Sequence, residues 1–386
     1  MLEVEFTGTP IAAEDKAKRG LLGRNKSLDV LRAIAVLLVM FTHLHLLSKQ
    51  QVTGFSKLIR LSLVWGPRGG WIGVDLFFVL SGFLVAGLLF SEYKKSSNIH
   101  VGRFLLRRGF KIYPNFIFFI ITAFLLERLV LNMHYPVSLY IKDLFFIHNY
   151  FGGRFGHTWS LDVEEFFYFF LVAYLLVLVR FKKVNLRNLI ITDIVLIVLG
   201  VTARFINNIK YPVLNFNMHY EKTHFRLESL FLGVVLSYLY HYNKDELFTF
   251  SKRWKKQVFL PIILLLLIPF IVDRAQNHWI SVVFLSIMPF SFCTLIILAL
   301  QSDSAFFNNR VLSFLGTYSY GIYLWHFPIQ EWLLPASFNS QQEWLVYAIS
   351  YFSLSIILGI LSTYVVEKPF LKIRDRLFPS KSLGSV

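Results

Sequence analysis

Long apolar segments recur along the whole chain and are separated by short stretches rich in charged residues, Gly and Pro. A helix needs about 20 mostly apolar residues to cross a bilayer, and only helices satisfy every backbone polar group within a single segment. Ten segments of this kind are expected, at 28–47, 72–91, 114–131, 160–179, 188–206, 226–241, 257–273, 280–300, 313–334 and 344–365. The pattern predicts an all-α polytopic membrane protein with about ten transmembrane helices in a single bundle.

The distribution of charge supports this interpretation and orients the predicted bundle. The chain is 55% hydrophobic and 16% charged, with a net charge of +16. Of its 39 Lys and Arg, 26 fall in alternate segments that include both termini, and 10 fall in the loops between them. Cytoplasmic loops carry such an excess, so both termini are expected to be cytoplasmic and the basic excess does not indicate nucleic acid. We expect a cytoplasmic N-terminal tail without a cleavable signal at 1–26, a membrane domain at 27–370 and a short basic cytoplasmic tail at 371–386.

The first predicted span carries ionisable groups that a lipid-facing helix would avoid. The segment 27–47 contains Asp29, Arg32, His43 and His45. Arg32 and His43 are eleven residues apart, which places both on one helix face about 16 Å from each other. Charges within a span are costly and usually functional, so this face is expected to meet protein or a water-filled cavity.

A basic segment, GRFLLRRGFKIYP, follows the second span. Arg103, Arg107 and Lys111 recur every four residues with Arg108 beside them, so four cations share one helix face, and Pro114 is expected to end the element. The cations suit an interfacial helix that reaches lipid phosphates. They equally suit a phosphate cradle for a cytosolic, nucleotide-bearing donor. The spacing alone does not separate these two hypotheses.

A second group of polar residues is expected at one depth, in the outer half of the bilayer. Its members come from six spans: His43, Asp75, Glu164, Glu165, Arg204, Arg226, Glu228 and His326. Acids in the first turns of a helix are stabilised by its dipole and need no function. A group of acids, arginines and histidines is harder to explain as packing, because each buried charge costs several kcal/mol unless it is paired. We therefore expect a polar path through the bundle, with an anionic reagent inside and a second reagent approached from outside.

Histidine is the natural base for this chemistry, because its pKa near 6.5 lets it accept a hydroxyl proton at neutral pH. Base catalysis by His43, with a carboxylate orienting the ring, is the mechanism that the residues allow most directly. No nucleophile elbow, H-E-x-x-H zinc pair or Walker loop is present, and no metal is expected. A transporter or flippase for an anionic lipid-linked sugar remains the alternative; it would predict two related halves with interrupted helices, and no such symmetry is visible.

Several segments together resemble the integral-membrane acyltransferase-3 family, whose members acylate bacterial surface glycans. They are LDVLRAIAVLLVMFTHL, GVDLFFVLSGFL, RR-x-x-K-I-Y-P, HTWSLDVEEFFYF, RLESLFLG and GTYSYGIYLWHFPI. The resemblance runs over about residues 26–375. It implies transfer of an acyl group, commonly acetyl, from acyl-coenzyme A to a hydroxyl of a cell-surface or lipid-linked sugar such as O-antigen or exopolysaccharide. It also implies a multi-pass protein of the inner (plasma) membrane that contacts the lipid bilayer and a glycan acceptor.

The resemblance implies roles for particular residues. His43 falls on the family's essential histidine, and Arg32, Arg107, Arg108 and Lys111 would bind the donor. Lys111 departs from the family's usual arginine, which keeps the charge but loses the bidentate fork. Many relatives carry a further C-terminal esterase-like domain, and this chain is expected to need a separate protein for any second step. The full set of expected site residues is catalytic His43, Glu164 and Asp75, with Trp159, Glu165, Arg226, Glu228, Tyr323 and His326 at the acceptor.

Overall fold

The computed structural model describes residues 25–44, 68–211, 219–272, 279–335, 338 and 340–379. Most of the expected N-terminal tail and the end of the expected C-terminal tail lie outside these residues, as does His45. Within the described part every regular element is helical. The larger elements are α2 (Lys26–His43), α4 (Ile72–Ser96), α5 (Val101–Leu129), α6 (Val137–Leu144), α7 (His148–Phe151), α8 (Trp159–Arg180), α9 (Leu186–Lys210), α11 (Leu227–Tyr242), α12 (Lys244–Arg253), α13 (Leu260–Leu264), α14 (Ile268–Ile271), α15 (Ile280–Gln301), α16 (Arg310–Thr317), α17 (Ser319–Leu333), α18 (Gln341–Ser362) and α19 (Lys368–Leu377).

Several of these helices are long and apolar enough to cross a membrane, which makes this a multi-pass membrane protein. Five pass that test among the described residues: Ile72–Ser96, Val101–Leu129, Leu186–Lys210, Val282–Gln301 and Gln341–Leu377. A sixth passes if Lys244–Arg253 and Lys255–Ile271, bent by 77°, form one span. The all-helical class is therefore confirmed, and each of the ten expected ranges contains helix. The count of ten spans and the orientation of the termini stay predictions.

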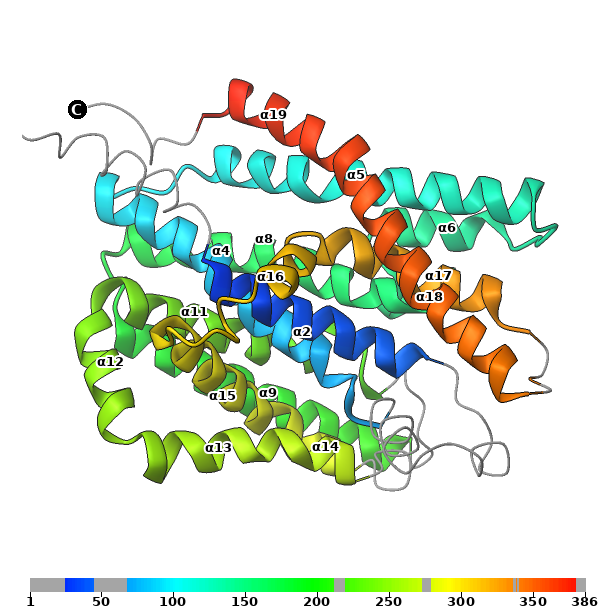
Figure 1. The fold of residues 1–386 in the computed structure, drawn as a ribbon. Coiled ribbons are helices and arrows are strands. Elements are labelled where there is room, and N and C mark those ends of the chain that lie inside the picture. Colours follow the sequence, from blue (N-terminus) through cyan, green and yellow to red (C-terminus); the bar gives the residue numbers. More distant parts are fainter. Residues whose placement is uncertain are drawn as a thin grey trace, which may run out of the picture.

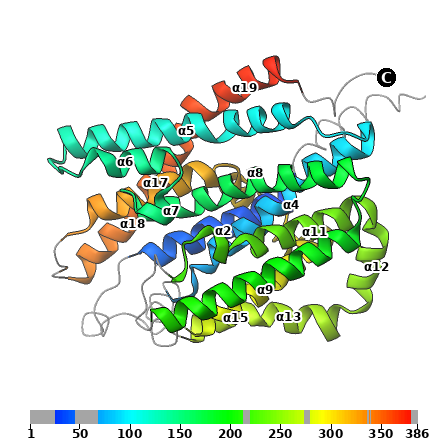
Figure 2. The same ribbon diagram turned by 180° about the vertical axis from the view of Figure 1, so that it is seen from behind.

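The helix α2 lies inside the bundle (Figures 1 and 2) and packs against α4, α16 and α17. The most extensive helix pair is α4 with α11. On the opposite side of α2, α17 packs against α18, and α5 and α19 run along the outside (Figure 1). This arrangement places the polar face of α2 between the layer that contains α4 and the layer that contains α17.

The α4–α11 contact depends on two glycines that let the helix backbones touch. A Cβ added to Gly82 would overlap the carbonyl oxygen of Leu230, and one added to Gly233 would overlap that of Val79. Small residues at such positions allow close helix packing in membranes. Gly82 and Gly233 therefore set the distance between α4 and α11.

Replacing Gly82 by alanine is expected to lower stability by about 1–3 kcal/mol, because the methyl group meets backbone that cannot move aside. The measurement is thermal unfolding in detergent followed by tryptophan fluorescence. Gly102→Ala is the matched control, because nothing lies within 4 Å of a Cβ at that position. Equal unfolding temperatures for the two variants would contradict the packing argument.

The basic segment and the third expected span form one continuous helix, α5, which contains Pro114. The prediction that Pro114 ends the element is therefore wrong. Proline removes a single backbone donor, and membrane helices tolerate this because neighbouring groups satisfy the carbonyls nearby. The carbonyl left without a helical donor is that of Phe110, and Tyr320 adds a hydrogen bond from its hydroxyl to the nearby carbonyl of Ile112 at 3.0 Å. The helix thus carries the cations directly into the bundle.

Candidate active site

A cavity of about 270 Å³ lies between α2, α4, α5, α8 and α17. One part of its wall is apolar and comes mainly from α4, including Phe77, Leu80 and Leu84. The polar lining comes from Arg32, Ser81, Arg108, Lys111, Ser160, Glu164, Glu165, Tyr168, Ser319, Tyr320 and Tyr323. Helices far apart in the sequence therefore supply both an apolar wall and a charged wall to one space.

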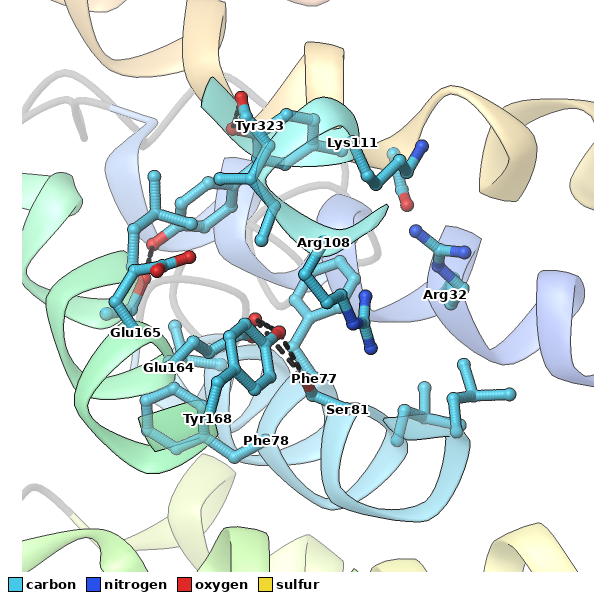
Figure 3. Close-up of a pocket in the computed structure, with 18 of the residues that line it drawn as sticks. Arg32, Phe77, Phe78, Ser81, Arg108, Lys111, Glu164, Glu165, Tyr168 and Tyr323 are labelled. Atoms are coloured by element: carbon cyan, nitrogen blue, oxygen red, sulfur yellow. Dashed lines mark hydrogen bonds between the residues drawn. The ribbon is translucent and has the colours of Figure 1, made fainter. Parts of the chain in front are cut away.

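The charges in this cavity are separated by sign (Figure 3). Arg32, Arg108 and Lys111 extend on one side, and Glu164 and Glu165 lie on the other. The sequence predicted these cations and carboxylates at different depths. The structure instead places both sets around one cavity, because α5 enters the bundle without a break and its cations come level with the first turns of α8. The cavity can therefore hold a ligand that has both an anionic and a polar end.

The adjacent arginines of α5 have different surroundings. Arg107 donates to the carbonyl of Phe378 and lies 3.1 Å from Asp375, so its charge is paired at the end of α19. Arg108 points into the cavity, with its guanidinium 4.9 Å from the ring centre of Tyr168. Its Nε is buried without a hydrogen-bond partner, and within the described residues no carboxylate pairs with it. Of the two, Arg108 is the one positioned to bind an anion.

Lys111, the position that departs from the family pattern, is held by a carboxylate from the far end of the chain. Its ammonium group pairs with Glu367, which is only 3% exposed. Glu367 ends a π-helical turn, η6 (Thr363–Glu367), between α18 and α19. Such turns re-aim side chains and are frequent at functional sites. The sequence expectations did not include Glu367 among the site residues.

The acids on the opposite wall are held by hydroxyl groups. The carboxylate of Glu164 accepts from Tyr168 at 2.5 Å and from Ser81 at 3.3 Å. The carboxylate of Glu165 accepts from Tyr113 at 2.8 Å. Hydrogen bonds of this kind fix the carboxylates while leaving acceptor capacity directed at the cavity.

Tyr323 forms the wall of the cavity that faces a cluster of histidines. Its hydroxyl donates to the carbonyl of His157 at 2.8 Å and lies 2.6 Å from Ser160 Oγ. Its ring centre lies 5.3 Å from those of both His157 and His326. His43 does not line the cavity. Tyr323 and His326 lie between His43 and the cavity.

His43 ends α2 and meets His326 of α17. Its Nδ1 lies 3.0 Å from the carbonyl oxygen of Val39 and 3.2 Å from Nε2 of His326. The partner expected from the sequence was a carboxylate, and the structure supplies an imidazole in its place.

A third imidazole, His157, completes the cluster and was absent from the sequence expectations. Its ring stacks on Phe327 at 5.1 Å, and its Nε2–H donates to the carbonyl of Leu324 at 3.1 Å. That carbonyl is available because Pro328, four residues later in α17, has no N–H to donate to it. Burial, with a smaller contribution from His326 and His43, holds the pKa of His157 well below its usual value. His157 is therefore neutral at neutral pH.

Two of the expected site residues form a buried ion pair. Asp75 pairs with Arg226, both side chains are fully buried, and Tyr220 donates to the same carboxylate at 3.1 Å. Trp159 packs edge-on against Tyr220 with ring centres 5.1 Å apart. The carboxylate of Asp75 is thus engaged by an arginine and does not orient the ring of His43.

The remaining expected residue of this group, Glu228, lies in a second ion pair. Its carboxylate accepts from Arg204 at 2.5 Å and from Ser286 at 3.2 Å. Arg204 also donates to the carbonyl of Phe225. These contacts join α9, α11 and α15, so Arg204 and Glu228 pair with each other rather than extend into the cavity.

A family model described as an acyltransferase domain matches residues 25–364, which include every element of the cavity and the histidine cluster. The chain belongs to this acyltransferase family. The match confirms the resemblance identified from the sequence segments.

Curated relatives support the same assignment. A protein named "Putative O-acetyltransferase" from Staphylococcus aureus (strain COL) is 32% identical over 369 residues, which is 89% of this chain and 57% of the relative. The protein named O-acetyltransferase OatA from Staphylococcus aureus (strain NCTC 8325 / PS 47) is 27% identical over 375 residues, again 89% of this chain and 57% of the relative. This chain thus spans little more than half the length of these relatives. No solved structure matches it.

Proposed function

We propose that the protein transfers an acyl group, most simply acetyl, from acyl-coenzyme A to a hydroxyl of a cell-surface or lipid-linked sugar such as O-antigen or exopolysaccharide. His43 is the general base, and the protein works in the plasma membrane. The observation that carries the proposal is a cavity that has a basic wall on one side. On another side it is lined by Tyr323, whose ring contacts the histidine cluster. The membrane-embedded acyltransferase family and the names of the relatives give the reaction class.

The basic wall suits an anionic donor. No carboxylate among the described residues pairs with Arg108, and Arg32 and Lys111 line the same cavity. The guanidinium of Arg108 can bind a phosphate directly, and Arg32 and Lys111, the latter already paired with Glu367, raise the positive potential around it. The cavity, at about 270 Å³, lies near the lower end of ligand sites, which span roughly 300–1,000 Å³. It therefore takes part of acyl-coenzyme A: the phosphates at the basic wall and the acyl end along the apolar side chains of α4.

The acceptor hydroxyl binds beside His43, and the side chain of Tyr323, which separates His43 from the cavity, must move aside for this hydroxyl to reach the donor. His43 removes the proton from the sugar hydroxyl, whose oxygen attacks the thioester carbonyl. The carbon–sulfur bond breaks, and the proton taken up by His43 is returned to the coenzyme A thiolate. Glu164 and Glu165 orient the donor from the opposite wall by accepting hydrogen bonds from it. Asp75, Arg226, Glu228 and Trp159 maintain the packing of the helices on the acceptor side.

The neighbouring arginines allow a matched test of the donor site. Arg108→Gln is expected to raise the donor KM at least about tenfold, because one charge-assisted contact is worth about 1.5–3 kcal/mol. Arg107→Gln, one residue away and paired with α19, is expected to change it by less than about threefold, since exposed ion pairs contribute about 0–1 kcal/mol. The measurement is acyl transfer by purified protein in nanodiscs with labelled acyl-coenzyme A. Equal effects at both positions would refute the donor assignment.

The same preparation separates the transferase from a transporter. With a sugar acceptor and labelled donor, the proposal predicts a labelled ester on the sugar. Movement of a lipid-linked sugar across liposomes without any acyl donor, and without ester formation, would instead support the flippase hypothesis.

A further inference from the structure

Two imidazoles that are 283 residues apart in the sequence form a hydrogen-bonded pair at the end of α2. Nδ1 of His43 and Nε2 of His326 lie 3.2 Å apart, and the ring centres are 5.0 Å apart. His326 is fully buried and its Nδ1 lies 2.5 Å from the carbonyl oxygen of Tyr323. The pair therefore has a backbone carbonyl at each end, from Val39 and from Tyr323.

These carbonyls determine where the protons sit. A carbonyl oxygen only accepts, so the ring nitrogen that faces it carries hydrogen. Nδ1 of His326 is therefore protonated, which leaves its Nε2 as an acceptor. Nδ1 of His43 is protonated for the same reason, and its hydrogen is shared between Val39 and His326. The lone pair of neutral His43 is then on Nε2, the atom that can act as the base.

We propose that His326 is the positioning residue for His43: it accepts from Nδ1–H, fixes the ring so that Nε2 faces the substrate hydroxyl, and stabilises the imidazolium formed during transfer. The role rests on the proposed function of His43 as the base. When Nε2 takes the hydroxyl proton, the bond from Nδ1 to His326 becomes charge-assisted and strengthens. No covalent change occurs at His326, because the Tyr323 carbonyl cannot take a proton, and the proton leaves again through His43.

The surroundings explain why an imidazole suits this position better than a carboxylate. Phe327 lies edge-on to His43 with ring centres 5.2 Å apart, and the neutral His157 stacks on the same phenyl ring. A carboxylate placed among these rings would be a buried charge while His43 is neutral, which costs several kcal/mol. A neutral acceptor avoids that cost and still supports the charged state.

Comparison of two substitutions tests the role in catalysis. His326→Ala removes the acceptor, and His326→Gln places an amide oxygen within reach of the same position. Alanine is expected to lower kcat at least about tenfold with both KM values changed less than about twofold, because the contact strengthens only as charge develops. Glutamine is expected to recover most of the lost kcat. An increased acceptor KM with unchanged kcat would overturn the proposal in favour of a substrate-binding role, as would unchanged kcat in the alanine variant.

A second measurement does not depend on activity or on the acyltransferase assignment. Nitrogen NMR of protein labelled at histidine, in nanodiscs, reports which ring nitrogen carries hydrogen, and His43→Gln identifies the His43 signals. The proposal predicts hydrogen on Nδ1 of His43, with a resonance that shifts in His326→Ala. Hydrogen on Nε2, or no shift, would overturn the pairing even if transfer activity is confirmed. The predicted spectrum without transfer activity would instead refute the proposed function alone.

Discussion

His43→Ala is expected to reduce acyl transfer by about 10²–10⁴-fold, the usual contribution of a general base. His43 is the ring in the cluster whose Nε2 remains available, since its Nδ1 is engaged by Val39 and His326. Binding of the donor should persist, because His43 does not line the cavity that contains Arg108. The measurement is transfer from labelled acyl-coenzyme A to a sugar acceptor, together with donor affinity.

His134→Ala is the matched control for this variant. His134 is exposed, and among the described residues its side chain hydrogen-bonds only to the carbonyl of Asn132, so its removal should leave transfer unchanged. Wild-type transfer by His43→Ala, with normal folding on size-exclusion chromatography, would contradict the assignment of the base. Loss of donor binding in the same variant would place His43 at the donor site instead.

Removal of Arg226 should have the largest effect on stability, about 3–5 kcal/mol, because it leaves the carboxylate of Asp75 buried without its charged partner. Both side chains of this pair are fully buried, between α4 and the start of α11. The expected result for Arg226→Met is a lower unfolding temperature in detergent and poor recovery of monodisperse protein. The measurement is fluorescence-detected size-exclusion chromatography after heating.

The double variant Asp75→Leu with Arg226→Met separates pairing from packing. Replacing both charges by apolar residues removes the unpaired carboxylate, so much of the lost stability should return. Asp375→Asn is a second control, because its partner Arg107 lies at a more exposed site and such pairs contribute about 0–1 kcal/mol. A double variant no more stable than Arg226→Met would show that packing, rather than charge pairing, determines the effect.

The sequence predicted much of the helical framework because apolar length and charge distribution are local properties. The helix from Lys26 to His43 carries Arg32 and His43 on one continuous element, as the spacing indicated. The prediction that Pro114 ends a helix was wrong, since membrane packing tolerates one missing donor. The depth of a residue in the membrane can be estimated by counting from the end of its helix. The sequence does not show which side chains of other helices lie beside it. For this reason Arg108 and Glu164 were expected at different depths in the membrane. The structure instead places both around one cavity.

The missed residues depend on contacts between distant parts of the chain. His157 meets Leu324 across 167 residues, and Lys111 meets Glu367 across 256. One signal for the first contact was present: Pro328 follows Leu324 by four residues, which leaves a carbonyl that a nearby donor must satisfy. The π-helical turn that aims Glu367 had no such signal in the sequence.

The most direct test of the account is a structure of the protein with a non-hydrolysable acyl-coenzyme A analogue. The account predicts phosphate groups beside Arg32, Arg108 and Lys111, and the acyl carbonyl directed at Tyr323 on the side of His43. An analogue bound outside the cavity, with Arg108 uncontacted and its acyl carbonyl remote from Tyr323, would contradict the account.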